Sequence, residues 1–319
     1  MNRREAIKTT ALGVGALSVA TSCIGTSKQK GMETQAIGVQ LFTIPMMIDQ
    51  DFRGTLKKLS EIGYKEVEFF GPYPASSAGT KEEFKMLQQM LKLKQHAFYG
   101  YSVKDTAAML REFGLTAPSM HVNIKSLREN PTQLLDELAE LKPKYIVVPA
   151  IMEGRSNLDD YKKLAAEFNS FGEQASKYGM KFLYHNHGYE HQEMSGAIPM
   201  DFLIENTNPD YVQFELDIFW MAAAGADPIA YLKKYPGRYK ALHIKDSSEK
   251  FRFAGNGDSP QEWMGGFPKM ADPGSGIFDI ESIIAAANKN GVDHWFLERD
   301  LAPQPEETLQ NSYAYLSQL

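Results

Sequence analysis

Short apolar runs alternate with segments of helical periodicity over most of the chain. Between the runs, apolar residues recur at helical spacing, as at Phe52, Leu56 and Leu59, ahead of Gly63, a residue type that commonly ends helices. The rhythm of strand, helix and glycine predicts βα units and a parallel sheet. Eight runs are rich in β-branched and aromatic residues and have the length of buried strands: residues 36–42, 65–70, 118–124, 144–151, 181–187, 212–219, 240–246 and 294–300.

Eight βα units in a row are what a (β/α)8 TIM barrel requires, and we expect one α/β barrel domain over residues 36–319. An open doubly wound sheet is the alternative. It would need a glycine-rich phosphate turn after its first strand, and the sequence GVQLFTIP at residues 38–45 has none. Residues 71–117 and 247–293 are overlong connections, so we expect them to carry extra helices or loops over the barrel mouth.

The N-terminus has a different character from the barrel. Paired arginines at positions 3 and 4 come before a short apolar run at residues 11–20 and the sequence ATSC, which ends at Cys23. This order resembles a twin-arginine export signal with a lipoprotein cleavage site, whereas the alternative is a frayed apolar end of a cytosolic protein. We therefore expect an export signal at residues 1–22, a lipid anchor on Cys23, a tether at residues 23–35 and a periplasmic location, with the lipid as the only link to a membrane.

Composition and charge narrow the range of partners. The chain is 43% hydrophobic and 23% charged, as is ordinary for a globular protein, and its one cysteine excludes an internal disulfide. Loss of residues 1–22 would take the formal net charge from −6 to −8, because three basic residues and one acidic residue leave with them. Such an acidic domain is poorly suited to binding the phosphate backbone of nucleic acids.

Polar side chains gather where the later strands end. Side chains two residues apart in a strand share a side, so one side of each strand can face the barrel axis. If it does, Asp217, His243 and Glu298 meet at the C-terminal mouth together with the turn at residues 185–190. The side chains that the alternation places on these sides are His185, His187, Glu215, Asp217, His243, Lys245, His294 and Glu298.

Carboxylates that converge with an imidazole suit one divalent metal ion, Mn²⁺, Mg²⁺, Co²⁺ or Zn²⁺. The cation would also offset the repulsion between the acids. Each residue has an ordinary explanation by itself, since an aspartate at a strand end often caps a helix and a histidine in a strand is often a hydrogen-bonded core group. Their joint appearance at consecutive strand ends favours a metal site.

Three stretches resemble the xylose isomerase-like barrels, often called sugar phosphate isomerases or epimerases. They are YHNHGYE at residues 184–190, FELDIFWMAAAGADPIAYLKKYPGRYKALHIKD at 214–246 and FLERD at 296–300, and the resemblance covers about residues 36–319. It implies one divalent metal held by Glu, Asp, His and Glu, of which the last three match Asp217, His243 and Glu298.

The first ligand departs from the family pattern. Many relatives have a glutamate at the end of the fifth strand, where this chain has His185. Relatives that read Tyr-His-Asn-His usually carry a glutamate a few residues later, and Glu190 fits that place. The resemblance thus implies Glu190 as the fourth metal ligand, with His185 as its rival.

The resemblance also implies proton transfer at a carbon next to a carbonyl, with the metal stabilising an enediolate. Glu190, Glu298 and His185 are the expected catalytic residues. Two carboxylates on opposite sides of a sugar would epimerise it, return of the proton to the adjacent carbon would isomerise it, and loss of a β-substituent would be elimination. The side chains expected to bind substrate are His187, Lys245, Trp220 and His121, although Lys245 could form an ion pair and Trp220 could seal the barrel instead.

We expect a small carbohydrate as substrate and no nucleic acid partner. An exported protein meets few phosphorylated intermediates, so a free sugar, keto sugar or keto glycoside is favoured over a sugar phosphate. The alternatives are a lyase or dehydratase acting on a 3-keto sugar, a nuclease of the same fold, which the charge disfavours, and a sugar-binding lipoprotein without catalysis. A homodimer is the default oligomeric expectation.

Overall fold

The computed structural model describes residues 35–94 and 98–319. The expected export signal, Cys23 and the tether up to residue 34 lie outside the described residues. Within the described part, each helix is too short or too polar to cross a membrane.

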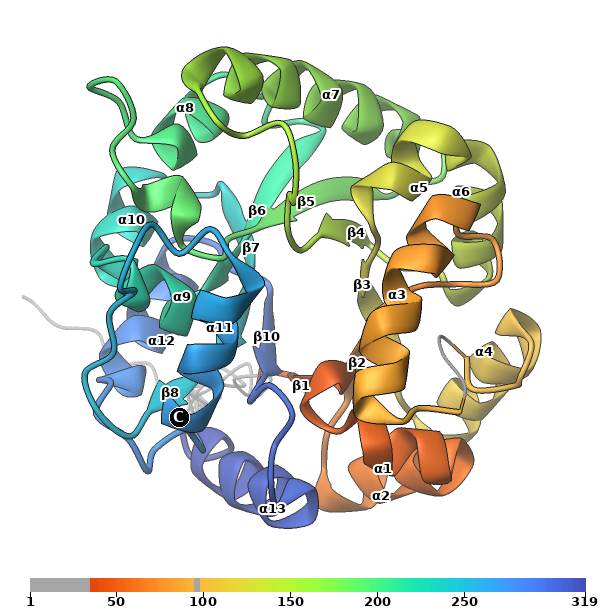
Figure 1. The fold of residues 1–319 in the computed structure, drawn as a ribbon. Coiled ribbons are helices and arrows are strands. Elements are labelled where there is room, and N and C mark those ends of the chain that lie inside the picture. The colour runs from red at the N-terminus through yellow and green to blue at the C-terminus, as the bar shows by residue number, and fades with distance from the viewer. Residues whose placement is uncertain (1–34, 95–97) are drawn as a thin grey trace, which may run out of the picture. The chain divides into compact units, whose positions relative to one another are not determined.

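Eight parallel strands close into a barrel, which confirms the predicted (β/α)8 architecture (Figure 1). Neighbouring strands follow one another in chain order around the ring, and the last pairs with the first. Each of the eight predicted apolar runs overlaps one barrel strand, although β3 and β7 begin before their predicted runs at residues 118 and 240. The strands are β1 (Ile37–Gln40), β2 (Glu66–Phe69), β3 (Thr116–His121), β4 (Tyr145–Val148), β5 (Lys181–His185), β6 (Val212–Asp217), β7 (Tyr239–Ile244) and β10 (His294–Leu297).

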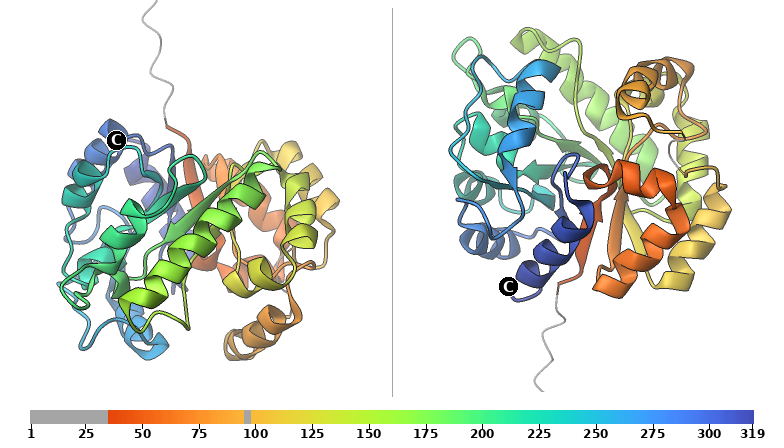
Figure 2. Two further views of the ribbon diagram at one scale, coloured as in Figure 1. Left: turned by 90° about the horizontal axis from the view of Figure 1, so that it is seen from above. Right: turned by 60° about the horizontal axis from the view of Figure 1, so that its bottom comes forward.

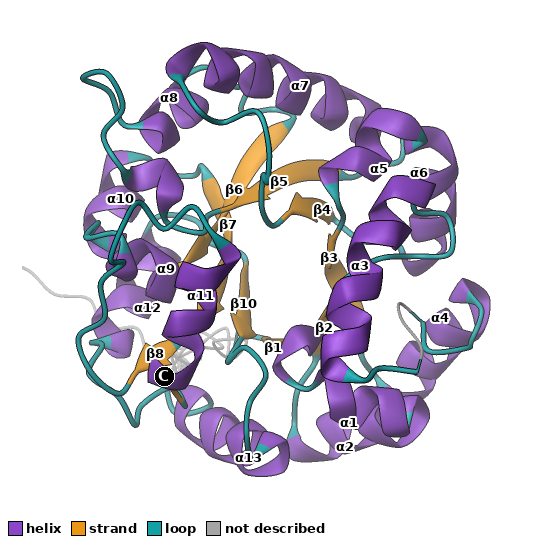
Figure 3. Cartoon of the chain, in the orientation of Figure 1, coloured by secondary structure: helices purple, strands orange, loops and turns teal. Residues whose placement is uncertain are grey.

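Helices surround the strands on the outside of the ring (Figure 3). The α-helices are α1 (Pro45–Gln50), α2 (Phe52–Ile62), α3 (Ala78–Leu91), α4 (Val103–Phe113), α5 (Ile124–Glu129), α6 (Pro131–Leu138), α7 (Leu158–Ser176), α8 (Pro199–Glu205), α9 (Ile218–Ala223), α10 (Pro228–Lys234), α11 (Pro260–Gly266), α12 (Ile280–Lys289) and α13 (Pro305–Leu316). Single 3-10 turns are η1 (Leu41–Thr43), η2 (Ala139–Leu141), η3 (Tyr189–His191) and η4 (Phe267–Lys269).

Helix α2 shows how local sequence sets these boundaries. The Asp51 side chain accepts a hydrogen bond from the Gly54 amide at 2.8 Å and caps the first turn. Phe52, Leu56 and Leu59 are buried against the barrel, and Gly63 ends the helix with a φ of 127°, a backbone conformation that favours glycine.

The barrel interior is layered. An apolar layer of Val147, Leu183, Ala241 and Phe296 fills the middle. Toward the N-terminal end of the strands, His294 Nδ1 lies 2.8 Å from Glu66 Oε2, and this pair is buried. Toward the C-terminal end the interior side chains are almost all polar, so this end is where chemistry is expected.

The two overlong connections do carry additional elements. Residues 71–117 hold α3 and α4, and residues 247–293 hold α11, α12 and most of a two-stranded antiparallel sheet of β8 (Asp246–Ser247) and β9 (Met270–Ala271). In the left view of Figure 2, α3 (orange) and α11 (blue) project from the same end of the barrel. Both helices follow the C-terminal ends of strands, so they rim the mouth.

Candidate active site

Strand register brings the polar side chains together at the mouth. Glu215 on β6 is paired with His185 on β5, and Asp217 is paired with His243 on β7. All four are at most 1% exposed. The alternation predicted from the sequence is therefore confirmed for these strands, and the side chains face the barrel axis.

Asp217, His243 and Glu298 form what we call the mouth group. One ligand atom from each lies within 4.8 Å of the others. His243 Nδ1 lies 2.5 Å from Glu298 Oε2 and 4.0 Å from Asp217 Oδ2. Asp217 Oδ1 accepts a hydrogen bond from the Trp220 amide at 2.9 Å and caps α9. Its Oδ2 is buried and accepts no hydrogen bond, although the Lys245 ammonium is 3.0 Å away.

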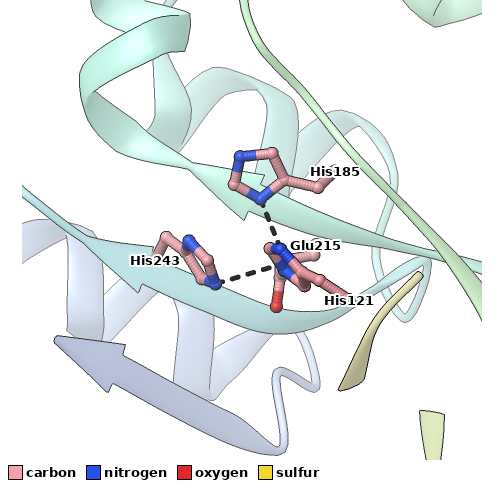
Figure 4. A group of neighbouring side chains, drawn as sticks. All are labelled: His121, His185, Glu215 and His243. Atoms are coloured by element: carbon pink, nitrogen blue, oxygen red, sulfur yellow. Dashed lines mark hydrogen bonds and ion pairs between the residues drawn. The ribbon is translucent and has the colours of Figure 1, made fainter. Parts of the chain in front are cut away.

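A second set lies beside it and shares His243. His121, His185, Glu215 and His243 also have ligand atoms within 4.8 Å of one another, and we call them the inner group (Figure 4). Glu215 Oε2 lies 2.9 Å from His121 Nε2 and 3.0 Å from His185 Nδ1. His121, which was expected to contact substrate, lies in this inner group and contacts two interior carboxylates, Glu215 and Glu68.

Glu68 on β2 is a central member of the site that sequence reasoning missed. Its Oε2 lies 2.6 Å from His243 Nε2, and its carboxylate also accepts hydrogen bonds from Gln40 and Ser119. The side chain is fully buried. The alternation of Glu66 and Glu68 with apolar residues in β2 was a usable signal, because it places both glutamates on the inner side.

Lys245 is surrounded by acids. Its Nζ lies 2.7 Å from Asp300 Oδ2, 2.8 Å from Glu298 Oε2 and 3.0 Å from Asp217 Oδ2. The ion-pair alternative for Lys245 is therefore realised, with these three acids as its partners. A buried ammonium among carboxylates keeps its charge, and burial alone would lower its pKa, but Asp217, Asp300 and Glu298 raise it well above the usual value.

Charge is distributed unequally among the three interior imidazoles. Burial alone would lower the pKa of His121, but Glu68 and the hydrogen bond to Glu215 raise it to about 9. Burial would likewise lower the pKa of His243, but Glu215, Glu298 and Glu68 raise it well above its usual value. For His185 burial dominates and lowers the pKa well below 6.5, so this ring is neutral. A neutral imidazole is the form that binds metals.

The mouth group fits a divalent cation. Burial raises the pKa of Asp217, although Lys245 and His243 oppose the shift. Its Oδ2 accepts no hydrogen bond, and a cation at that oxygen would offset the cost of burying the charge. Two carboxylates and an imidazole are a common donor set for Mn²⁺, Co²⁺ and Zn²⁺. His185 adds a further donor, since its Nε2 lies 3.7 Å from Asp217 Oδ2.

Glu190 does not join either group. Its carboxylate accepts hydrogen bonds from the Tyr184 hydroxyl, from the His187 amide at 3.1 Å and from the Gly188 amide at 2.8 Å. Gly188 adopts a φ of 98°, and a Cβ there would lie 2.7 Å from the Trp220 carbonyl oxygen, so this turn needs glycine. The turn therefore directs Glu190 back to its own strand, and the structure does not bring it to Asp217, His243 and Glu298.

His187 and Trp220 line one side of the mouth. His187 Nδ1 lies 2.6 Å from the Pro149 carbonyl oxygen, and its ring packs on Trp263 at 4.8 Å. Trp220 is 1% exposed and stacks against His187 and Phe253. The indole thus belongs to the packed wall, as in the sealing alternative, and His187 is the more accessible of the two.

His191 gives this turn a pH-dependent stability. The ring lies edge-on to Tyr231 with centroids 4.7 Å apart, and neither nitrogen has a hydrogen-bond partner in the protein. Burial, partly offset by Asp201, lowers the pKa of His191 from 6.5 to about 4. Because the folded pKa is below the unfolded one, this contribution to stability is complete above pH 6.5 and is lost as the pH falls towards 4.

Replacing His191 with phenylalanine should remove that pH dependence. Linkage predicts that the wild type loses about 2 kcal/mol of unfolding free energy through His191 between about pH 7.5 and about pH 5. Urea unfolding of wild type and His191→Phe at both pH values measures the difference. An equal loss in the two proteins would show that His191 does not titrate as its burial implies.

The chain is similar to several known proteins over most of its length. Inosose dehydratase from Clostridium beijerinckii is 24% identical over 282 residues, which cover 84% of this chain and 87% of that protein. The structure of a sugar phosphate isomerase/epimerase from Parabacteroides distasonis has a TM-score of 0.70 at 24% identity and covers 90% of this chain and 95% of that chain. That of 3-keto-D-glucoside 4-epimerase from E. coli has a TM-score of 0.57 at 18% identity, covering 89% and 100%.

A protein-family model matches the part of the chain that forms most of the barrel and its polar mouth. The model described as xylose isomerase-like TIM barrel matches residues 56–319, from within α2 to the end of the chain. The match includes seven of the eight barrel strands and every residue of the mouth group. The chain belongs to the xylose isomerase-like TIM barrel family.

Proposed function

We propose that the protein is a divalent-metal-dependent enzyme that moves a proton at the carbon beside a carbonyl of an unphosphorylated sugar, keto sugar or keto glycoside, and so isomerises or epimerises it. The observation that carries the proposal is the convergence of Asp217, His243 and Glu298, with a buried carboxylate oxygen left without a hydrogen bond. Family membership supports carbohydrate chemistry of this kind.

The ligand set that we propose is His185, Asp217, His243 and Glu298. His185 is preferred to Glu190 as the fourth ligand because its Nδ1 is used by Glu215, which leaves Nε2 facing Asp217 Oδ2 at 3.7 Å. Glu190 has both oxygens engaged in hydrogen bonds within its own turn.

When bound, the ion would polarise the substrate carbonyl and stabilise the enediolate. Glu298 is the proposed base. Burial alone would raise its pKa, but Lys245 and His243 lower it below the usual range, so it is ionised and can accept the α-proton. Lys245, held at 2.7 Å by Asp300, can donate a hydrogen bond to a substrate oxygen. His187, whose ring stacks on Trp220 while the Lys245 ammonium lies over the same indole at 5.3 Å, can orient a hydroxyl.

Elimination is the second candidate, and the position of Glu190 favours it. Epimerisation by two carboxylates on opposite sides of the sugar would use Glu190 together with Glu298, whereas Glu190 is fully buried in its turn. Elimination needs one base and one group that protonates the departing hydroxyl, and Glu298 with Lys245 could fill these roles. The similarity to inosose dehydratase supports this alternative.

The charges around the mouth favour an unphosphorylated substrate. Arg155 bonds to the carbonyl oxygens of Ile151 and Asp258, and Arg299 is paired with Asp272 at 2.7 Å. Arg252 bonds to the Ala222 carbonyl. Since these side chains are already engaged, they do not form the convergent cluster that a phosphate group requires.

Turnover after metal exchange tests the proposal. The protein is stripped with a chelator and reloaded separately with Mn²⁺, Co²⁺, Zn²⁺ or Mg²⁺, then incubated with ketoses, 3-keto glucosides and inososes, and with the phosphate esters of the sugars. We expect metal-restored turnover of an unphosphorylated compound. A product of unchanged mass indicates isomerisation or epimerisation, and loss of one water indicates dehydration. Turnover of phosphate esters alone would refute the substrate class.

We also propose that the protein is exported and anchored by a lipid on Cys23, on the strength of the paired arginines and the sequence ATSC. Incorporation of a labelled fatty acid that is lost in Cys23→Ser would support the anchor, and labelling that persists in the variant would refute it.

A further inference from the structure

Two buried carboxylates lie directly beneath the proposed metal position. Glu68 from β2 and Glu215 from β6 are both fully buried, and neither belongs to the mouth group. Glu68 contacts His243 and Glu215 contacts His185. The other ring nitrogen of each histidine faces the mouth group. Their position raises the question of what two interior acids contribute to a site in which they are not proposed as ligands.

His243 uses its two ring nitrogens in opposite directions. Nε2 lies 2.6 Å from Glu68 Oε2 and 3.3 Å from Glu215 Oε2, whereas Nδ1 points to Glu298 and Asp217. An ionised carboxylate can only accept, so the proton on Nε2 is held by the two acids. Nδ1 donates to Glu298 in this structure, and a divalent cation bound at the mouth group would displace that proton and take the Nδ1 lone pair.

His185 repeats this arrangement with the nitrogens exchanged. Its Nδ1 lies 3.0 Å from Glu215 Oε2, and its Nε2 faces Asp217 Oδ2. The acid below therefore fixes the proton on Nδ1 and leaves the Nε2 lone pair toward the mouth. Once the Nδ1 proton of His243 is displaced, the two histidines would have opposite tautomers, and each would direct one lone pair at the mouth group.

The acids themselves are held firmly. His121 Nε2 lies 3.2 Å from Glu68 Oε2 and 2.9 Å from Glu215 Oε2, so one imidazole bridges and partly neutralises the pair. Gln40 donates to Glu68 at 2.8 Å, and Ser119 donates to its other oxygen. With these contacts Glu68 cannot turn away from His243.

We propose that Glu68 and Glu215, bridged by His121, are positioning residues that select the tautomers of His243 and His185 and so direct both lone pairs at the metal. The inference rests on the proposed function. Neither acid touches the ion or the substrate, and removal of Glu68 should weaken metal binding through His243 while the mouth group stays intact.

Glu68→Met, Glu68→Gln and Glu66→Met form a matched series. Methionine has nearly the shape of glutamate but accepts hydrogen bonds poorly, whereas glutamine keeps one strong acceptor for His243. Glu66 is the control because it sits on the same strand and makes an equivalent buried pair with His294 Nδ1 at 2.8 Å, away from the mouth. Glu66→Met loses its buried pair with His294, and Glu68→Met loses its buried pairs with His243 and His121.

Dissociation constants for Co²⁺ and Zn²⁺ are measured by chelator competition, with thermal unfolding as the check on folding. Loss of a partner beneath a metal-binding histidine typically costs about 10–100-fold in affinity, and we expect this for Glu68→Met, with less than about tenfold for Glu68→Gln and little change for Glu66→Met. Equal affinities of Glu68→Met and Glu66→Met would overturn the inference. A wild type that binds neither ion would instead refute the proposed function.

The tautomers can be read directly without any variant. The chain has seven histidines, so ¹⁵N-histidine labelling of the Zn²⁺-loaded protein gives a resolvable set of ring correlations. We expect a proton on Nε2 of His243 and on Nδ1 of His185. A proton on Nδ1 of His243 in the loaded protein would overturn the inference even if Glu68→Met fails to fold.

Discussion

Asp217→Asn should lose nearly all activity and most of its metal while keeping its fold. Asparagine keeps a side-chain oxygen that can accept the Trp220 amide and cap α9, but it removes the charge at the oxygen that has no hydrogen bond. We expect turnover to fall about a thousandfold, equivalent to about 4 kcal/mol of transition-state stabilisation. Metal analysis and steady-state kinetics measure both effects.

Asp227→Asn is the matched control for that variant. Asp227 also caps a helix, because its carboxylate accepts hydrogen bonds from the amides of Ile229 and Ala230 at the start of α10. Unlike Asp217, it is exposed, and these hydrogen bonds do not involve the mouth group. It should keep wild-type metal content and turnover. If Asp217→Asn behaves like Asp227→Asn, Asp217 is a helix cap and nothing more.

His185→Gln and Glu190→Gln should fail in different ways. His185→Gln should weaken metal binding by about 100-fold or more, because an amide replaces the imidazole lone pair that faces Asp217. Glu190→Gln should keep its metal but lose about 1–3 kcal/mol of unfolding free energy, because the new amide group opposes donors from Tyr184, His187 and Gly188.

Metal content and urea unfolding of the two variants, measured together, separate the two residues. Each variant serves as the control of the other, since both replace one buried side chain of the same short segment with glutamine. Metal loss in Glu190→Gln with metal retained in His185→Gln would return Glu190 to the ligand set and refute the assignment of His185.

Sequence periodicity was sufficient where a strand continues. The period of two placed Glu215 with Asp217 and His243 with Lys245, and the structure confirms that these side chains face the barrel interior. The eight βα units and the single barrel followed from the same patterns. These predictions succeed because a buried strand leaves each side chain only two directions.

Beyond the end of β5, the hydrophobic periodicity did not predict the directions of the side chains. Glu190 lies in a 3-10 turn whose direction is set by the positive φ of Gly188 and by Tyr184 on the outer side of the same strand. The family pattern supplied a residue type at that position but not its orientation. A backbone reversal of this kind has no period from which its side chains could be placed.

The sequence also did not predict which side chains of distant strands contact each other. Glu68 and His243 are separated by 175 positions in the chain and meet at 2.6 Å. Which carboxylate approaches which imidazole depends on barrel closure and on the register shifts beside β2 and β6. The sequence could predict which acidic side chains face the barrel interior. The contacts between those acids and the histidines could be assigned only from the three-dimensional structure.

Deuterium uptake from D₂O tests the central claim most directly. The protein, loaded with Mn²⁺ or Mg²⁺ and separately stripped, is incubated with ketoses and 3-keto glucosides, and the carbon beside the carbonyl is followed by NMR. We predict that deuterium enters at that carbon only when metal is present, and that Asp217→Asn abolishes the uptake. Tight sugar binding with no exchange in the loaded wild type would contradict enediolate chemistry and identify a binding protein.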